Sequence, residues 1–548
     1  MKMKKFLSVA QTVNEGLIPA MGNEVASDGM RIKGSMRSLR ASILVVGLAA
    51  LGAVGCSTLP ERGDVSEQRA MMLAEDGRLD AFVGRQETRW PGTSGFRLVG
   101  YGPEALAIRI HSAAMADHSI DVQTYIWKAD LTGLYLAHEL LLAANRGVRV
   151  RLLIDDLDAR NNNAGLAALD AHPDIHVRLF NPTPSRRGTW SLAGDVLRDG
   201  RRLNRRMHNK AWIVDNRVAL GGGRNLGNEY FGASDAANFA DLELAMAGPV
   251  VRQLSASFDA FWNDEASYPV ALLSPEAVTH QSLQEIRETL AQAARRAAVT
   301  DYAALVADDN ALERRLAGDW ALDWTPEYRF VADDPSKVRQ KPEPGLSRVL
   351  AALLAALDTA EYSIRIVSPY FVPGREGSAR LVAHAGRLDS VSVLTNSLAA
   401  NDVVAVHGGY ARYRKRLLKG GVGLWELKPT IVDRTEQRIM PSSSASLHAK
   451  AASIDVSGVF VGSYNLDPRS TSLNAEQGVF VRSAALAGDF NAMFDRVVTG
   501  QQSWRVSLES GSLRWRDGEE VHATEPDAGL SLRFMAGLMR WLPIQSQL

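Results

Sequence analysis

The stretch His448-Ala449-Lys450-Ala451-Ala452-Ser453-Ile454-Asp455 decides the fold of this chain, because its pattern occurs twice. It continues, after six residues, to Gly462-Ser463-Tyr464-Asn465. The earlier copy reads His208-Asn209-Lys210, then Asp215, then Gly222-Gly223-Arg224-Asn225. The histidine, lysine, aspartate, small residue and asparagine fall at identical offsets in both copies. Chance is a poor explanation, and the pattern indicates an internal duplication.

The flanks of the two copies repeat as well. Ser119-Ile120 precedes the first copy and Ser363-Ile364 the second, and each pair is followed by a helix-like stretch and a β-rich run. Strands that alternate with helices indicate a mostly parallel sheet with helices on both faces. We therefore predict an α/β fold of two similar domains, each with a mostly parallel mixed β-sheet flanked by helices, related by a pseudo-two-fold axis. Residues 239–244 are predicted to form one returning strand after the first copy.

The length of 548 residues exceeds what one core usually supports, so two domains are expected on size alone. The predicted organisation is an export signal over residues 1–56, a polar tether over 57–94 and a first domain over 95–273. An Ala- and Arg-rich helical connector over 274–337 and a second domain over 338–548 complete it.

The spacing of histidine and lysine has a chemical meaning. Two residues two positions apart on a strand project to the same face, so each copy would present an imidazole and an ammonium together. Two copies facing each other would gather these groups around one pocket that suits a phosphodiester. Lys210 and Lys450 would bind the phosphate as point charges. The expected hydrogen-bond donors to it are Asn225, Ser463 and Asn465.

The H-x-K-x4-D pattern resembles the signature of the phospholipase D superfamily. Further stretches resemble bacterial cardiolipin synthases, and fit best the C-type branch, at residues 146–156, 222–225, 462–470 and 542–548. The resemblance covers nearly all of the chain beyond residue 95. It departs at the N-terminus, where a lipoprotein-like signal replaces the membrane anchors of other branches.

The resemblance implies a reaction through a covalent phosphohistidine. His208 is then the nucleophile and His448 the general acid and base, an order that the similarity of the two halves leaves open. A nucleophilic imidazole needs its other nitrogen oriented by an acceptor. In the family a carboxylate beyond the motif does this, and the matching positions are Asp241 and Glu476.

The motif aspartates Asp215 and Asp455 belong to the catalytic signature, and we expect them to brace its backbone and lysine. A histidine with a lysine beside it is a poor metal ligand, because the ammonium repels a cation. The superfamily chemistry is metal-free, so we predict no metal and no cofactor.

The implied reaction makes cardiolipin from phosphatidylglycerol and a second phospholipid, either phosphatidylglycerol or phosphatidylethanolamine. The main alternative is a hydrolytic phospholipase D, in which water is the acceptor. A superfamily nuclease and a non-catalytic lipid-binding protein are further alternatives. Lys+Arg and Asp+Glu both total 62, and this zero net charge argues against a nucleic-acid partner.

The N-terminus predicts export. Arg37 and Arg40 precede an apolar run over 41–54, which ends in Ala53-Val54-Gly55-Cys56. Small residues before a cysteine look like a bacterial lipobox, so we predict that Cys56, the only cysteine, is lipidated. The protein would then be held at a bacterial cell membrane with a periplasmic catalytic body. An uncleaved signal anchor is the alternative.

The C-terminal stretch 530–542 mixes apolar residues with Arg533 and Arg540. A final helix packed on the body is the favoured interpretation. The alternative is a helix on the bilayer surface with Trp541 in the interface.

Overall fold

The computed structural model describes residues 58–73, 76–160, 162–186, 195, 199–300, 322–341, 347–429, 445–499 and 501–541. The chain divides into two units, and the larger one, residues 60–182 and 201–548, contains both copies of the motif. The predicted export signal and Cys56 lie outside the described residues. None of the helices in the described ranges has the length and apolar content needed to cross a bilayer.

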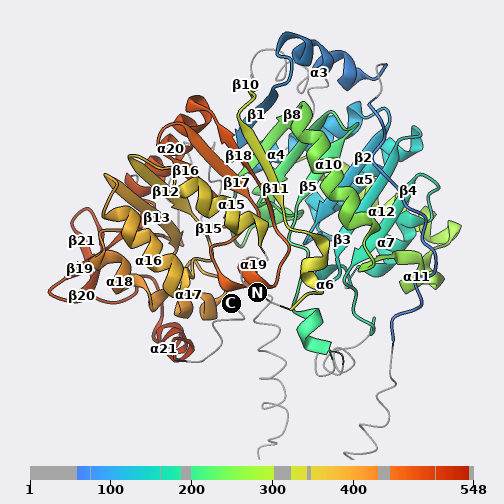
Figure 1. Cartoon of the computed structure of the whole chain (residues 1–548). Coiled ribbons are helices and arrows are strands. Elements are labelled where there is room, and N and C mark those ends of the chain that lie inside the picture. The colour runs from blue at the N-terminus through green and yellow to red at the C-terminus, as the bar shows by residue number, and fades with distance from the viewer. Residues whose placement is uncertain are drawn as a thin grey trace, which may run out of the picture. The chain divides into compact units, whose positions relative to one another are not determined.

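The first half of the larger unit is built on a nine-stranded sheet (Figure 1). Three neighbouring strands, β2, β3 and β4, are parallel, and the other pairs are antiparallel. The core on one side of this sheet includes Leu106, Leu136 and Leu166, from the three helices α4 (Gly102–Met115), α5 (Leu131–Asn145) and α7 (Asn163–Asp170). In sheet order the strands are β10 (Asp323–Thr325), β1 (Ser94–Val99), β8 (Glu243–Ala247), β6 (Val218–Gly222), β5 (Ala211–Val214), β2 (Ser119–Thr124), β3 (Arg149–Asp155), β4 (Ile175–Phe180) and β9 (Ser267–Pro269).

The second half repeats this plan in a ten-stranded sheet. Its parallel strands β12, β13 and β14 correspond to β2, β3 and β4, and its antiparallel strands β16, β17 and β18 to β5, β6 and β8. The predicted α/β architecture of two similar domains with mixed sheets is therefore confirmed. The sheets are mostly antiparallel rather than mostly parallel, because within these two sheets only neighbouring strands that are joined by crossover helices run in the same direction. In sheet order the strands are β11 (Tyr328–Ala332), β18 (Gln477–Arg482), β17 (Gly458–Gly462), β16 (Ala451–Ile454), β12 (Ser363–Val367), β13 (Ser390–Asn396), β14 (Gly423–Leu427), β19 (Ser503–Glu509), β20 (Ser512–Asp517) and β21 (Glu520–His522).

The two halves share one core. Helix α10 (Pro249–Asn263) of the first half contributes Phe258 and Phe261 to it, and α20 (Ala484–Thr499) of the second half contributes Phe490 and Phe494. Side chains from both sheets, such as Leu244, complete this core. Because a shared apolar core resists separation, it holds the two copies of the motif in a fixed relation.

The residues predicted to connect the domains are divided between the two halves. Helix α12 (His280–Ala297) packs on α5 and puts Leu283 and Leu290 into the core of the first half. Strand β10 pairs with β1 in the first sheet, whereas β11 already pairs with β18 in the second. The chain therefore crosses from one half to the other between residues 325 and 328.

The segment that precedes α3 (Arg78–Arg89) follows the surface of the first half in an extended form. Its Arg62 donates to the backbone oxygen of Ser267, and the backbone N–H of Ala70 donates to Asp259. The region predicted as a tether thus contacts the first half of the larger unit.

Candidate active site

The two motif copies lie where the halves meet. The residues just before each copy leave their own sheet and pair with the opposite half. Strand β15 (Ala445–Leu447), which leads into His448, pairs in parallel with β7 (Asn238–Ala240), which leads into Asp241. For the first copy the equivalent contact is a parallel β-bridge between Met207, which precedes His208, and Ala475 of the second half, which precedes Glu476.

This crossed pairing corrects two predictions about strands. His208 and Lys210 precede β5, and His448 and Lys450 precede β16, so the motif residues lie in the extended segments that lead into the strands. The single strand predicted over 239–244 is split into β7 and β8. The reason is the same in each case, because these segments satisfy their backbone groups on the partner half before they join their own sheet.

Each motif histidine binds a carboxylate of the opposite half. His208 Nδ1 lies 2.8 Å from Glu476 Oε2, and His448 Nδ1 lies 2.5 Å from Asp241 Oδ2. The sequence predicted both acids as partners of the histidines. The structure shows in addition that each acid binds the histidine of the other half. Such a bond fixes the ring and its tautomer and leaves Nε2 as the nitrogen that faces a substrate.

The Glu476 carboxylate is buried within a set of hydroxyl donors. Ser463 Oγ donates to its Oε2 at 2.5 Å, and Ser470 Oγ donates to Oε1 at 2.9 Å. Ser463, which the sequence suggested as a phosphate ligand, therefore positions this carboxylate. Asp241 has a different neighbour, since its Oδ1 accepts the backbone N–H of Leu242 at 2.8 Å.

The two dyads differ in charge. Burial raises the pKa of Glu476 to about 7, although Lys210 and the two serines oppose the rise. Burial also acts to raise the pKa of Asp241, but the facing His448 and the nearby Lys450 outweigh it and hold this pKa below its usual range. Asp241 is thus a carboxylate at neutral pH, whereas Glu476 changes its protonation there.

The histidines and lysines are tuned by burial and by one another. Burial, followed by Lys210 and Lys450, lowers the pKa of His208 well below its ordinary value. Burial and Lys450 lower the pKa of His448 to about 4, a fall that Asp241 limits. Burial lowers the pKa of Lys450 to about 8 and that of Lys210 well below 10.5. Each ammonium also donates to the backbone oxygen of its own motif histidine.

The motif asparagines are buried next to this site. The Asn225 side chain donates to the Tyr230 hydroxyl at 2.9 Å and accepts the backbone N–H of Ile126 at 3.2 Å. Asn465 is also buried, and its Oδ1 has no hydrogen-bond partner among the described residues. Their predicted contact with a phosphate stays a prediction.

The motif aspartates bind backbone groups. Asp215 accepts the backbone N–H groups of residues 117–119 at 3.0, 2.9 and 2.8 Å. Asp455 accepts those of residues 361–363 at 3.0, 2.8 and 2.8 Å. Both have a positive φ, 51° and 56°, in the turn that follows β5 or β16. Each aspartate therefore ties the end of its motif strand to the start of the neighbouring strand.

Aromatic rings cover both imidazoles. Tyr125 packs edge-on against the His208 ring, with centroids 5.0 Å apart. Tyr230 and Phe239 pack against His448 at 5.3 and 5.1 Å. Sequence reasoning gave these residues no role, although the aromatic positions after Ser119 and Ser363 were a visible signal. They form the apolar part of the surroundings of the two imidazoles.

Two polar groups at the site also escaped prediction. The Arg469 guanidinium donates to both Asn204 Oδ1 and the Asn204 backbone oxygen at 2.6 Å, and its charge contributes to the lowered pKa of His208. The Tyr370 hydroxyl donates to Asp402 at 2.8 Å, and the charge of Asp402 acts on the pKa of Lys450. Arg469 lies inside the stretch 462–470, whose resemblance to the family gave this side chain no individual role.

Potential metal ligands gather elsewhere. Within the described ranges, one group of three such side chains has its ligand atoms close together, namely Asp76, Asp80 and His118. His118 precedes β2, whereas Tyr125, which contacts His208, follows it. This group is thus at the opposite end of the strand from the histidines.

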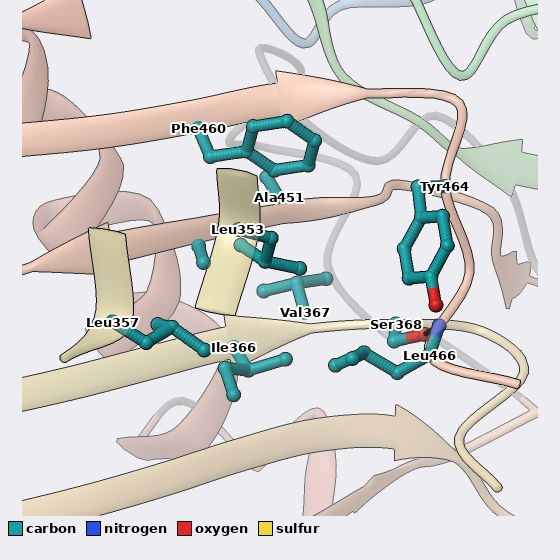
Figure 2. A pocket seen from close by; sticks show the side chains of 10 residues that line it. Leu353, Leu357, Ile366, Val367, Ser368, Ala451, Phe460, Tyr464 and Leu466 are labelled. Carbon is teal, nitrogen blue, oxygen red and sulfur yellow. Dashed lines mark hydrogen bonds between the residues drawn. The ribbon is translucent and has the colours of Figure 1, made fainter. Parts of the chain in front are cut away.

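A small apolar pocket lies behind the second motif (Figure 2). Leu353 and Leu357 of α15 (Arg348–Leu357) line one end, and Ser368, Tyr464 and Leu466 line the other. The Ser368 hydroxyl is already used, because it donates to the backbone oxygen of Tyr370. The residues that line the pocket pack α15 against the sheet and against the loop that carries Tyr464 and Leu466.

Two α/β halves that exchange carboxylates across paired H-x-K-x4-D motifs define a phospholipase D-type enzyme. The sequence matches the family described as "Cardiolipin synthase, PLD-like domain" twice, at residues 107–262 and 353–498. These two matches cover more than half of the chain, which belongs to this family of phosphatidyltransferases.

Comparisons with single proteins agree. The chain is 38% identical over 465 residues to cardiolipin synthase C of Escherichia coli K12, covering 83% of this chain and 96% of that protein. It is 32% identical over 467 residues to an uncharacterized protein of Helicobacter pylori 26695, covering 83% and 89%. The crystal structure of phosphatidylserine synthase from Haemophilus influenzae Rd KW20 has a TM-score of 0.50 at 14% identity, covering 77% of this chain and 91% of that one. That likeness concerns the fold.

Proposed function

We propose that this enzyme makes cardiolipin by transferring a phosphatidyl group, through a phosphohistidine, to a hydroxyl of phosphatidylglycerol. The donor lipid is a second phosphatidylglycerol or phosphatidylethanolamine. The observation that carries the proposal is the crossed pair of dyads, His208 with Glu476 and His448 with Asp241. Two imidazoles with fixed Nδ1 atoms supply a nucleophile and a general acid on either side of one phosphate.

In the first half-reaction His208 Nε2 attacks phosphorus, and the bond to the head-group oxygen breaks. The leaving head-group alcohol takes a proton from His448 Nε2. In the second half-reaction His448 removes the proton of the acceptor hydroxyl, whose oxygen attacks phosphorus and breaks the P–N bond. With phosphatidylglycerol in both roles, the products are cardiolipin and glycerol, and the enzyme returns to its starting state.

The charge difference between the dyads supports His208 as the nucleophile. A nucleophile must be neutral, and burial and both motif lysines lower the pKa of His208 without an ionised carboxylate among the causes that oppose them. A general acid must hold a proton, and the ionised Asp241 favours the protonated form of His448. An incoming phosphodiester brings negative charge, which opposes the downward pKa shifts at Lys210 and Lys450 and favours both ammonium groups.

Transfer rather than hydrolysis is favoured by the surroundings of the histidines. Side chains of Tyr125, Tyr230 and Phe239 cover the rings, and His208 is only 7% exposed. A site that limits water favours a lipid hydroxyl as the acceptor. Phospholipid substrates also require contact with a membrane, and we propose that lipidation of Cys56 anchors the catalytic body on the periplasmic side.

The test uses phosphatidylglycerol labelled in its phosphate, in vesicles with and without phosphatidylethanolamine. The full-length enzyme is expected to form cardiolipin, and His208→Ala and His448→Ala are expected to form none. His522→Ala, which replaces a half-buried histidine on β21 that pairs with Glu520, is the matched control and keeps full activity. Phosphatidic acid as the main product would identify a hydrolase and overturn the transferase proposal.

A further inference from the structure

Helix α21 (Leu530–Met539) carries an apolar face that is turned to solvent. Leu530 is 83% exposed, Phe534 75%, Leu538 50% and Trp541 84%. These residues are spaced by four, four and three positions, so they line one side of the helix and its end. A contiguous exposed apolar surface on a folded protein marks a site of interaction with a protein or a membrane.

The opposite side of the same helix is firmly packed. Ala536 is buried against Leu398 and Ala528, and Leu532 packs on the same cluster. A Cβ atom on Gly408 of α17 (Val404–Ala411) would lie 3.0 Å from the Ala536 backbone oxygen, so the two helices are in close contact. The favoured sequence interpretation, a helix packed on the body, thus describes one side only.

Buried ion pairs fix the segment that leads into α21. Glu525 accepts hydrogen bonds from the guanidinium of Arg414, a residue with only 1% exposure, and lies 3.3 Å from His407 Nε2. Arg533 returns to donate to the Glu525 backbone oxygen. Because the segment before the helix is tied to the body and its second half lies against Gly408 of α17, the helix presents its outer face in a set orientation.

The helix is linked to the catalytic centre through α17, on which it packs. Its partner α17 begins two residues after Asp402, which accepts the Tyr370 hydroxyl and acts electrostatically on Lys450. In Figure 1, α17, α19 (Pro468–Ser472) and α21 lie along the lower edge of the molecule, where the segments that follow the parallel strands gather. Since the segments of His208 and His448 lead into β5 and β16 at the carboxyl ends of β2 and β12, a surface that binds α21 would lie along the same edge of the sheets as the two histidines.

The positive charge of this segment favours an anionic partner. Residues 528–541 contain Arg533 and Arg540 and no acidic residue. Both arginines fall on the flank of the helix between its packed and its exposed faces, as the 3.6-residue period places them. The exposed Arg540 can extend to a lipid phosphate while the apolar side chains enter the acyl region, and Arg533, held by its bond to the Glu525 backbone, adds its positive charge at the same flank. A second copy of this chain would bring like charges together.

We propose that the outer face of α21 docks on an anionic phospholipid bilayer and holds the edge of the sheets that carries the two histidines against the lipid surface. This inference rests on the proposed function, because the choice of a bilayer as the partner follows from a phospholipid substrate that is itself part of a bilayer. It gives the catalytic body a membrane contact of its own, separate from any anchor at the N-terminus.

The experiment places a reporter on the helix. Cys56 is the only cysteine, so Cys56→Ser removes it and Phe534→Cys in that full-length chain accepts a single environment-sensitive fluorophore. Vesicles containing phosphatidylglycerol are expected to shift its emission to the blue, and pure phosphatidylcholine vesicles to do so at about tenfold higher lipid concentration. The matched control is Val456→Cys in the same chain. Val456 is 71% exposed in the turn after β16, beside the start of β12 and at the opposite end of the sheet from the histidines, and the emission of its label is expected to stay unchanged.

A label at position 534 that ignores the vesicles, or one that responds no more than the label at 456, would overturn the proposal. A blue shift that depends on protein concentration and is complete before lipid is added would overturn it in favour of self-association. The binding readout needs no turnover, so adding His208→Ala leaves it unchanged, and failure of docking is distinguishable from failure of the proposed reaction.

A second measurement links docking to turnover. The triple variant Phe534→Ser, Leu538→Ser, Trp541→Ser is expected to lose about tenfold or more in turnover of vesicle-borne phosphatidylglycerol. It should keep its activity on a short-chain phosphatidylglycerol dissolved as monomers. The control variant Tyr362→Ser, Val456→Ser removes exposed apolar side chains at the far end of β12 and should behave as the unmodified enzyme. Equal loss on both substrates would contradict a docking role.

Discussion

Asp241 and Glu476 occupy equivalent places in the two halves, but replacing each by its amide is expected to have unequal consequences. Burial raises the pKa of Glu476 to about 7, so below that pH the side chain carries a proton, and glutamine matches its charge and shape. The pKa of Asp241 is held below its usual range by His448 and Lys450. Asp241→Asn therefore removes a full negative charge at every working pH.

The size of the effect follows from the bond that is lost. His448 Nδ1 lies 2.5 Å from Asp241 Oδ2, a hydrogen bond between charged groups once His448 is protonated. Such bonds contribute about 1.5–3 kcal/mol. Since about 1.4 kcal/mol corresponds to a factor of ten in rate, Asp241→Asn should lower kcat about 10- to 150-fold. Glu476→Gln at about pH 6 keeps a neutral bond to His208, and should cost less than about tenfold.

The pH dependence gives the sharper contrast. As the pH rises through about 7, the unmodified enzyme gains a carboxylate at Glu476 that stabilises the imidazolium formed when His208 is phosphorylated. The Glu476→Gln variant lacks this group, so its deficit should grow with pH. For Asp241→Asn the deficit on kcat should change little over the same range, since the carboxylate is ionised throughout.

The assay is the rate of cardiolipin formation from labelled phosphatidylglycerol between about pH 5.5 and 8.5. Thermal unfolding of each variant controls for stability, and His522→Ala serves as a substitution away from the dyads. Equal losses for the two variants at about pH 6, or a Glu476→Gln deficit that is constant across pH 7, would show that the dyads do not differ in charge.

Three further predictions concern the lysines, the braces and a buried ion pair. Lys450→Met should raise the pKa of His448 above about 4, because Lys450 contributes to its fall, and NMR titration of the imidazole checks this. Asp215→Ala should lower the free energy of unfolding by about 2–3 kcal/mol, by removing the acceptor of three backbone N–H groups, with kcat nearly unchanged in the folded fraction; the less buried Asp455→Ala should cost less. Arg151→Met should cost about 3–5 kcal/mol in denaturant unfolding, because it leaves Asp121 buried without its partner; a loss below about 1 kcal/mol would contradict this.

The duplicated fold was predictable because its sequence pattern occurs twice in the chain. Two motif copies with matched flanks set the number of domains, and the alternation of strands and helices set their class. The parallel strands β2, β3 and β4 and their counterparts in the second half follow from that pattern.

The exchange of carboxylates was not predictable from one chain read in order. Spacing along the chain suggested Asp241 and Glu476 as partners of the histidines, but only the packing of the halves determines which acid meets which ring. The same packing splits residues 239–244 into β7 and β8. It also turns Ser463 toward Glu476, a contact for which the local sequence offers no signal.

The asymmetry in charge likewise arises from the surroundings. Glu476 meets serine hydroxyls in a fully buried place, while Asp241 faces a histidine with a lysine beside it. The two motif copies share their histidine, lysine, aspartate and asparagine but differ at Gly223 and Ser463, and the Ser463 hydroxyl contributes to this difference together with Ser470 beyond the motif. The apolar face of α21, in contrast, could be read from the spacing of its residues, but which side packs on the body required the fold.

Trapping the covalent intermediate tests the phosphohistidine mechanism most directly. In His448→Ala, a phosphatidyl ester with a p-nitrophenol leaving group needs no protonation to react, while attack by the acceptor lacks its general base. The expected result is a burst of one p-nitrophenol per enzyme and an acid-labile, base-stable phosphatidyl adduct on the peptide that contains His208. Continuous release of p-nitrophenol without any adduct, or an adduct on another residue, would contradict this mechanism.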